Sequence, residues 1–124
     1  HLVNAVRAAG GTMLMTARSA PGGWGVRLPD LLSRLRAATL VEIAEPDDAL
    51  LSAVIAKLFA DRQVEVEPHV VSYLVRRIER SLATAAAVVE RLDRESLARG
   101  MRISRALAAE IITAFDEGQR ELPL

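Results

Sequence analysis

Arg34 is the residue whose surroundings best suit it to act on another molecule. It lies in residues 28–36, which read LPDLLSRLR. The proline and the leucine spacing predict a helix from Pro29 to Ala37, with the leucines facing inward and Arg34 on the opposite side together with Asp30. A guanidinium group stays charged and offers a planar fork of donors that fits phosphate oxygens. Arg34 is therefore a candidate phosphate contact, with an ordinary surface arginine as the simpler interpretation.

The other residues that could do chemistry are poorly placed for it. His1 and His69 are the only histidines and the chain has no cysteine, so no zinc site is predicted. Lys57 lies among apolar residues, outside any Gly-x-x-x-x-Gly-Lys-Ser/Thr motif, so the sequence contains no phosphate-binding loop. The acid pairs at 47–48 and at 65 and 67 lie where helices begin or turns occur, and acids are common there.

Composition predicts a soluble globular protein. The chain has 124 residues, 51% of them hydrophobic, and its sixteen basic residues balance sixteen acidic ones. No apolar run approaches the roughly 20 residues that cross a bilayer, and no signal-peptide pattern opens the chain. With no cysteine there is no disulfide framework. We therefore expect no membrane association and a cytoplasmic location.

Basic charge is concentrated in one part of the chain. Residues 76–105 contain eight arginines and four acids. Exposed helix faces are the simpler interpretation of such a run. The alternative is a surface that binds nucleic acid or an acidic protein. The eight arginines are Arg76, Arg77, Arg80, Arg91, Arg94, Arg99, Arg102 and Arg105.

The first part of the chain reads as a fragment of an α/β unit. A helix begins near Leu2, an apolar strand is predicted at Thr12–Thr16, a glycine-rich loop at Pro21–Gly25 precedes the Arg34 helix, and a second strand is predicted at Thr39–Ile43. Two apolar strands separated by a helix are typical of parallel neighbours in a larger sheet. Two strands cannot form that sheet alone, so we expect further sequence or a partner chain to cover them.

The rest of the chain is predicted to form four helices. Their apolar residues recur at spacings of three and four, and each helix has a start or stop signal. The first helix is expected to start at Pro46 and to end near Arg62, and the second to start at Pro68, with an apolar stripe that runs to Ile78. The third is expected between Ser81 and Gly100, and the fourth between Ser104 and Gly118. Only Val64–Val66 and Arg102–Ile103 read as extended here.

A core is predicted for these helices from five residues, because each of them lies on the apolar stripe of its helix. Leu50 and Leu82 belong to the stripes of the first and third helices by spacing. The residues predicted to converge in the core are Leu74, Val89, Leu92, Ile111 and Phe115.

Together these segments resemble a known family. Residues 28–35, after Thr12–Arg18 and Gly22–Trp24, resemble the second half of the AAA+ domain of the DnaA replication initiators. The resemblance is closer still to Hda, the DnaA-related regulators that inactivate DnaA by promoting hydrolysis of its ATP. It implies a mainly α chain with a small α/β remnant, namely the C-terminal edge of an AAA+ α/β nucleotide-binding domain (1–45), a helical lid bundle (46–118) and a tail (119–124).

The resemblance also implies roles for single residues. Arg34 matches the arginine finger, which reaches the nucleotide of a neighbouring subunit. Arg18 occupies the sensor 1 position, where the family more often has an acid. Ala83 occupies the sensor 2 position, where an arginine is expected, and Arg80, one turn away, could substitute for it.

The partners follow from the same resemblance. ADP or ATP is expected as the cofactor of the full-length parent, and none for this chain alone, which lacks the phosphate loop and is not expected to be catalytic by itself. DnaA is the expected partner, together with the DNA sliding clamp through a segment absent from this chain, and AAA+ self-association is left open.

Two alternatives to the regulator remain at this point. The first is a fragment of the DnaA initiator ATPase itself; the short acidic tail from Asp116, in place of a helix-turn-helix domain, favours the regulator over it. The second is a nucleotide-independent helical module that binds protein or nucleic acid through the arginines of residues 76–105.

Overall fold

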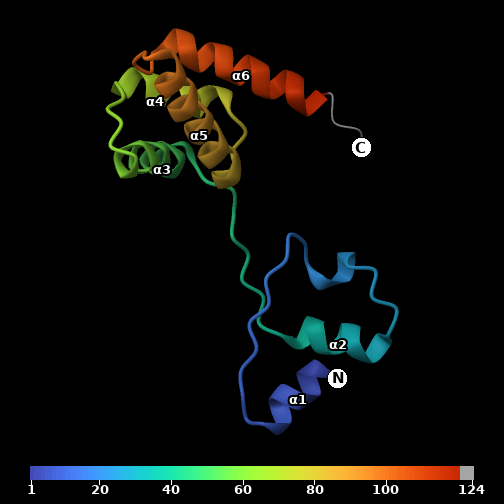
Figure 1. The fold of residues 1–124 in the computed structure, drawn as a ribbon. Helices are drawn as coiled ribbons and strands as arrows, with labels where there is room; N and C mark the ends of the chain where they lie inside the picture. The colour runs from blue at the N-terminus through green and yellow to red at the C-terminus, as the bar shows by residue number, and fades with distance from the viewer. Residues whose placement is uncertain (121–124) are drawn as a thin grey trace. The chain divides into compact units, whose positions relative to one another are not determined.

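The computed structural model describes residues 1–120, and these residues form two compact units (Figure 1). The first comprises His1–Glu42 and the second begins at Ile43. Six α-helices and one 3-10 turn account for the regular structure of the described residues, which contain no strand. Among these helices, none combines the length and apolarity needed to cross a membrane.

The first unit contains two short helices, α1 (Leu2–Ala8) and α2 (Pro29–Ala37), and the 3-10 turn η1 (Pro21–Gly23), which packs against α2. Proline at the first position of α2 suits a helix start, because its fixed φ is helical and its missing N–H has no partner there. Leu35 is the single buried side chain of the unit. Such a small core leaves most of the apolar residues of this unit in contact with solvent.

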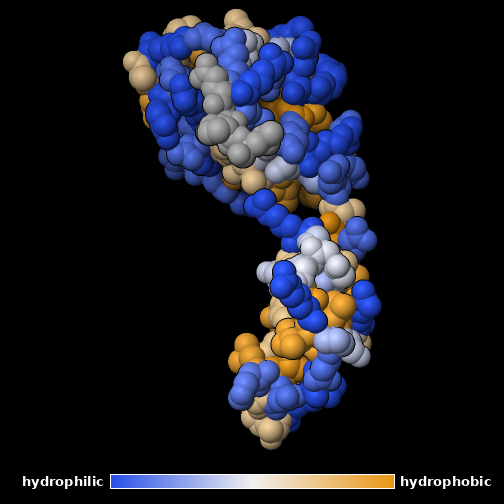
Figure 2. All heavy atoms as spheres, turned by 90° about the vertical axis from the view of Figure 1, so that its right-hand side faces the viewer, coloured by the Kyte–Doolittle hydropathy of each residue, from blue (hydrophilic) through white to orange (hydrophobic). Residues whose placement is uncertain are grey.

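Both strands predicted for the front of the chain are wrong. Residues 12–16 and 39–43 are irregular, and Leu14 and Ile43 are 91% and 93% exposed. A strand forms only where a neighbour pairs its N–H and C=O groups, and the described residues supply none. The α/β part of the predicted fold class is therefore not present in residues 1–120, and hydrophobic residues of the first unit remain visible on its surface (Figure 2).

The second unit is a four-helix bundle. Helix α3 packs against α4 and α5, and α6 packs against the same two helices, so α3 and α6 lie on opposite sides of the bundle (Figure 1). The helices are α3 (Asp48–Asp61), α4 (Pro68–Arg77), α5 (Leu82–Arg99) and α6 (Arg105–Arg120). The residues expected to be extended, Val64–Val66 and Arg102–Ile103, form no strand; Val64 and Val66 pack against the core and Ile103 is buried in it.

Helix ends in the bundle follow most of the signals in the sequence. Ser81 and Ser104 accept hydrogen bonds from the N–H groups of Thr84 and Leu107, at 3.3 and 3.2 Å, and so cap α5 and α6. Gly100 ends α5 in the left-handed conformation at φ 61°.

Two helix ends differ from the prediction. Helix α3 begins at Asp48 instead of Pro46, because the Asp47 carboxylate accepts the Leu50 N–H at 2.7 Å. Gly118 lies inside α6, which continues to Arg120. The predicted tail at 119–124 therefore begins within a helix, and residues 121–124 lie outside the described part of the chain.

The bundle core contains sixteen buried residues. Leu74, Val89, Leu92 and Ile111 are among them as predicted, and Phe115 is partly buried against the same cluster. Leu50 and Leu82 are exposed although helical spacing assigned them to apolar stripes. Both lie in the first turns of their helices, at the end of the bundle, where fewer side chains from other helices can cover them.

Candidate functional site

Arg34 lies on α2 and is partly covered, with 34% of its side chain exposed. Its Nε lies 3.4 Å from the Asp30 carboxylate, one helical turn earlier, and one terminal nitrogen donates a hydrogen bond to the side-chain oxygen of Asn4 in α1. The inward and outward faces predicted for this helix are therefore only partly correct. Leu35 is buried, but Leu28 is exposed and Arg34 contacts another helix of its own unit.

A shallow hollow of about 250 Å³ surrounds Arg34, lined by His1, Val3, Asn4 and residues 28–31. Pockets that bind small molecules generally enclose about 300–1,000 Å³ and carry several converging polar groups. This hollow is smaller. The hollow is therefore a poor small-molecule site.

The residues at the positions predicted for sensor 1 and sensor 2 differ in their side chains and in their surroundings. Arg18 is an exposed residue in the irregular segment between α1 and η1. Arg80 precedes the N-cap of α5, and its guanidinium lies 2.9 Å from the carboxylate of Asp48, the first residue of α3. Ala83, in the first turn of α5, is exposed and has no donor group.

These lid positions do not fit a nucleotide. A nucleotide site needs several donors converging on the phosphates. The start of α5 offers one guanidinium, that of Arg80, which the Asp48 carboxylate already neutralises. Within residues 1–120 no group of three or more acidic or histidine side chains could hold a metal ion.

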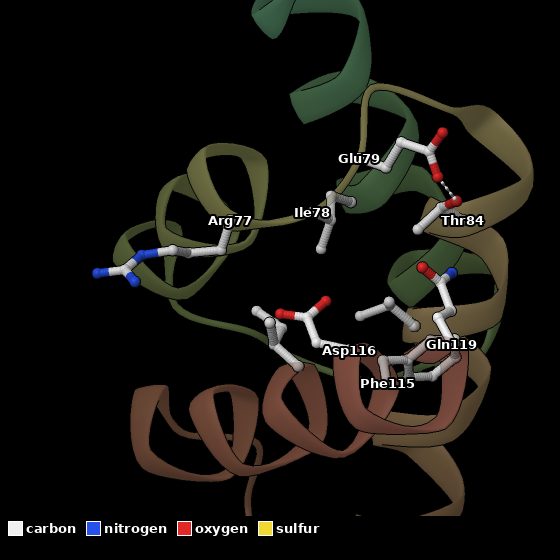
Figure 3. A pocket seen from close by; sticks show the side chains of 9 residues that line it. Arg77, Ile78, Glu79, Thr84, Phe115, Asp116 and Gln119 are labelled. Carbon is white, nitrogen blue, oxygen red and sulfur yellow. Dashed lines mark hydrogen bonds between the residues drawn. The ribbon is translucent and has the colours of Figure 1, made fainter. Parts of the chain in front are cut away.

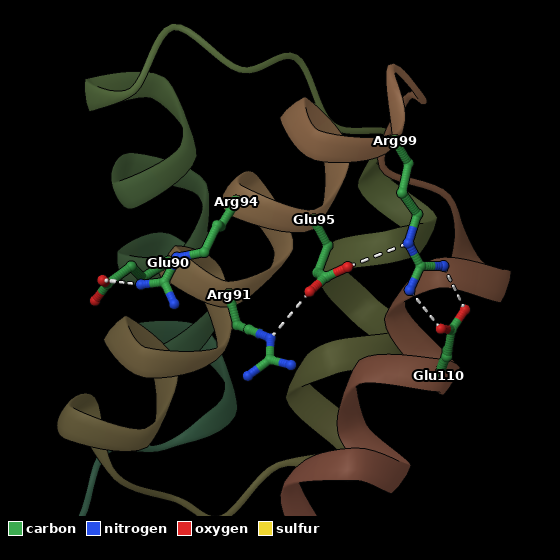
Figure 4. Close-up of polar contacts among 6 residues, drawn as sticks. All are labelled: Glu90, Arg91, Arg94, Glu95, Arg99 and Glu110. Carbon is green, nitrogen blue, oxygen red and sulfur yellow. Dashed lines mark hydrogen bonds and ion pairs between the residues drawn. The ribbon is translucent and has the colours of Figure 1, made fainter.

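Seven of the eight arginines of residues 76–105 fall into two groups, and Arg102, an exposed residue between α5 and α6, belongs to neither. Four of them pair with carboxylates, and Figure 4 shows three of these, Arg91, Arg94 and Arg99. Arg99 forms a bidentate ion pair, in which two guanidinium nitrogens donate hydrogen bonds to the Glu110 carboxylate at 2.9 and 2.6 Å. The paired arginines and their partners are Arg80 with Asp48, Arg91 with Glu95, Arg94 with Glu90, and Arg99 with Glu95 and Glu110.

The Arg99–Glu110 contact changes the proton affinities of both groups. Its hydrogen bonds lower the pKa of the Glu110 carboxyl, because they favour the charged form. The same hydrogen bonds raise the pKa of Arg99 further above its ordinary value. Both side chains are on the surface, so this is a local link between α5 and α6.

The second group of arginines surrounds an aromatic ring. Arg77 of α4 and Arg105 of α6 both lie over the ring of Tyr73, with guanidinium carbons 5.4 and 5.0 Å from its centroid. Arg76 is exposed and lies three residues from Tyr73 on the same helix. We call Tyr73, Arg76, Arg77 and Arg105 the cationic cluster. Among the described residues, no carboxylate lies within ion-pair distance of its arginines.

Sequence reasoning missed Tyr73. The signal that could have found it was the spacing of four between Tyr73 and Arg77, which brings a ring and a guanidinium together on a helix. The approach of Arg105, more than thirty residues later, had no signal of this kind. Only the packing of α4 against α6 brings it to the ring.

A second, smaller hollow of about 30 Å³ lies between α6 and the α4–α5 connection. Its floor is apolar, with Ile78, Val88, Ile112 and Phe115, and Asp116 points into it (Figure 3). The Arg77 guanidinium points away from this hollow, toward the outside of α4 (Figure 3). The hollow is the size of one water molecule, so it is a packing defect and not a ligand site.

Comparison with protein families shows that the bundle is related to a known domain. The family model for the lid domain of Hda matches residues 48–111, just over half of the chain, from the first residue of α3 into α6. The chain belongs to the Hda lid family. This membership links it to Hda-like regulation of DnaA and to the lid region of an AAA+ protein. No curated protein matches the chain at a significant level.

The match bears on the lid residues and not on the first unit. Arg80, Ala83 and the cationic cluster lie within the matched range, whereas Arg18 and Arg34 precede it. The helices α3, α4 and α5 fall wholly inside the match. The predicted lid is thus confirmed as an Hda lid.

Proposed function

We propose that this chain is part of an Hda-like regulator that inactivates the initiator DnaA by promoting hydrolysis of the ATP bound to DnaA. The observation that carries the proposal is the Hda lid match over residues 48–111. It favours the regulator over a fragment of DnaA itself. The short arginine helix α2, which precedes the lid in the chain, supports the same interpretation.

Arg34 is the residue proposed to act on the ATP of DnaA, as an arginine finger supplied in trans. A guanidinium placed at the transferred phosphoryl group stabilises the negative charge that develops there. In GTPases such an arginine accelerates hydrolysis by about 10³ to 10⁵. One unit of log rate corresponds to about 1.4 kcal/mol, so this is about 4 to 7 kcal/mol of transition-state stabilisation.

Release of Arg34 from its internal contacts costs less. An ion pair at i,i+4 on a helix surface, such as Arg34 with Asp30, is worth about 0.3–0.5 kcal/mol. The hydrogen bond from the charged guanidinium group to Asn4 adds about 1.5–3 kcal/mol. The Arg34 side chain can therefore give up its contacts with Asp30 and Asn4 for a stronger contact with phosphate.

The test is Arg34→Ala in the gene product that carries this chain. Phosphate release from ATP-loaded DnaA is measured with sliding clamp on DNA. We expect the variant to lose the stimulation and to keep its fold, because a partly exposed side chain leaves no core cavity. Arg36→Ala on the same helix is the matched control and should stimulate nearly as well as the parent. Full stimulation by Arg34→Ala would reject the finger assignment.

Nucleotide binding by this chain alone is a separate part of the proposal. The regulator is proposed to use ADP or ATP, yet the lid positions offer only Arg80, already paired with Asp48, and Ala83. We expect isothermal titration of residues 1–124 with ATP or ADP to show weak binding or none. Micromolar binding with one nucleotide per chain would contradict this.

A second candidate function rests on the cationic cluster. The absence of ion-pair partners for its arginines, in the part of the chain that the structure describes, favours a surface that binds polyanions. Such a surface is compatible with the regulator and with a nucleotide-independent interaction module. The parent protein in the same phosphate-release assay separates these two, since a module of the second kind would not stimulate DnaA at all.

A further inference from the structure

Like charges are brought close together at the cationic cluster. Arg77 and Arg105 lie 5.4 and 5.0 Å from one ring centroid, so their guanidinium carbons are at most about 10 Å apart. That separation is close to the Debye length of roughly 8 Å at physiological ionic strength. Their repulsion is therefore only partly screened, and an anion bound between or beside them would relieve it.

Other arginines of the lid differ from those of the cationic cluster, because their charge is neutralised by carboxylates on the same helix. On α5, Arg91 and Arg94 each have a glutamate four residues away, at 3.4 and 2.8 Å. On α4, no acid occupies the corresponding positions around Arg76 and Arg77, which end the helix. The positive charge of the lid is thus concentrated at the contact of α4 with α6.

From this geometry we infer that the cationic cluster binds the phosphate backbone of duplex DNA. Arginine forks suit phosphate oxygens. Each strand of duplex DNA carries one charge per roughly 3.4 Å of axis, so guanidinium groups up to about 10 Å apart can contact different phosphates of one strand. The inference goes beyond the proposed regulation of DnaA and does not depend on Arg34; it rests on the second candidate function and names its polyanion.

The aromatic ring argues for duplex DNA against two other partners. Single strands are bound by stacking of bases on open aromatic faces. The Tyr73 ring is partly buried and has guanidinium groups of Arg77 and Arg105 over it. Protein interfaces generally contain an apolar or aromatic centre. Here the aromatic residue is covered by charge, which leaves a surface of guanidinium groups for the partner.

The test uses the whole 124-residue chain and a labelled 30-base-pair duplex of mixed sequence. Affinity is measured by fluorescence anisotropy from 50 to 200 mM salt for the parent, for Arg77→Ala/Arg105→Ala, and for Arg91→Ala/Arg94→Ala. The last variant is the matched control, because it removes two arginines that have carboxylate partners and makes the same change in net charge. Circular dichroism verifies that all three proteins are equally helical.

Loss of two phosphate contacts should lower the magnitude of the salt slope by about 1.8, at roughly 0.9 per contact. Between 50 and 200 mM salt the affinity of the parent should therefore fall about 12-fold more than that of Arg77→Ala/Arg105→Ala. The control should keep the slope of the parent. Arg77→Lys/Arg105→Lys, which keeps the charge and loses the planar fork, should also keep most of the slope.

Three results would overturn the inference. The parent could fail to bind the duplex at 50 mM salt when the chain is present at about 1 mM. This concentration is roughly tenfold above the dissociation constant of weak non-specific DNA binding, about 0.1 mM. The control could lose as much of the slope as the cluster variant, which would indicate a general charge effect. Polyglutamate or a single strand of the same length could bind at least tenfold more tightly than the duplex, which would assign the surface to an acidic protein or to single-stranded nucleic acid.

Discussion

The two units of this chain use apolar residues in opposite ways. The lid, from Ile43 onward, buries sixteen residues in a core shared by four helices. The first unit, His1–Glu42, buries Leu35 alone and leaves Leu14, Leu28 and Leu40 exposed. Burial of apolar surface is the main stabilising term in folding. Similar side chains therefore stabilise one unit and add little to the other, because only the lid packs its helices around a shared apolar core.

The largest expected difference between the units is in amide hydrogen exchange of the whole chain. At about 0.05 kcal/mol per residue, the lid of roughly 80 residues has a stability near 4 kcal/mol, which slows exchange about 10³-fold. Amides in the middle of α5 should show this protection. Those of α1, a helix of seven residues with no buried side chain, should exchange almost freely, since isolated short helices are marginal in water. Equal protection of α1 and α5 would contradict the comparison.

Single core substitutions should give the next largest effect. Leu92→Ala should lower the free energy of unfolding of the lid by at least about 2 kcal/mol, because Leu92 is fully buried in α5 and its truncation leaves a cavity. A loss of about 4 kcal/mol or more would equal the stability of the lid, and the variant would then be unfolded already without urea. Leu97→Ala on the same helix removes the same atoms from an exposed position and should change it by less than about 0.5 kcal/mol. Urea unfolding followed by helical circular dichroism measures both.

Two further truncations extend this series across the molecule. Phe115→Ala should fall between Leu92→Ala and Leu97→Ala, because Phe115 is only partly buried. Leu35→Ala, in the first unit, should leave the unfolding midpoint of the lid where it is. A shift of that midpoint by Leu35→Ala, or a loss below 1 kcal/mol for Leu92→Ala, would show that the core is not divided between the units as described.

The lid could be predicted from the sequence because its determinants are local. Apolar spacing of three and four placed Leu74, Val89, Leu92 and Ile111 correctly. Cap residues work within one turn, so Ser81 and Ser104 could be assigned from their immediate neighbours. The same local rules failed for Leu50 and Leu82, because periodicity does not say where a helix extends past its neighbours.

The strands and the site depended on distant contacts. Residues 12–16 have strand-like composition, but a strand also needs a partner that composition cannot supply. The hydrogen bond between Arg34 and Asn4 joins residues thirty positions apart, and the approach of Arg105 to Tyr73 depends on helix packing. Local spacing could identify Arg34 as exposed on α2, but not the contact that covers part of it.

Removal of a helix cap should have a smaller effect than a core cavity. Ser81→Ala should lower the stability of the lid by about 1 kcal/mol, because the Thr84 N–H at the start of α5 loses its acceptor. Ser72→Ala is the matched control. The Ser72 hydroxyl bonds back to the Pro68 carbonyl inside α4, a contact that does not stabilise a helix, so its loss should cost nothing. Equal losses for the two serines would reject the capping role.

The smallest expected effect tests the surface link between α5 and α6, through its dependence on pH. The pKa of Glu110 is lowered in the folded lid from its ordinary value of 4.5 by hydrogen bonds from Arg99. A carboxyl group with a lowered folded pKa contributes stability above its unfolded pKa, and this contribution is lost as pH falls through the folded value. Glu110→Gln should therefore destabilise the lid slightly at pH 7, and the difference from the parent should shrink as pH falls below 4.5.

Urea unfolding at several pH values measures this difference in stability, since urea adds no salt that would screen the Arg99–Glu110 pair. Glu117→Gln, later on α6 and outside the ion pairs of the described residues, is the control and should show no such convergence. A difference between Glu110→Gln and the parent that stays constant from pH 7 to pH 3 would mean that the Arg99 contact contributes through packing and not through charge.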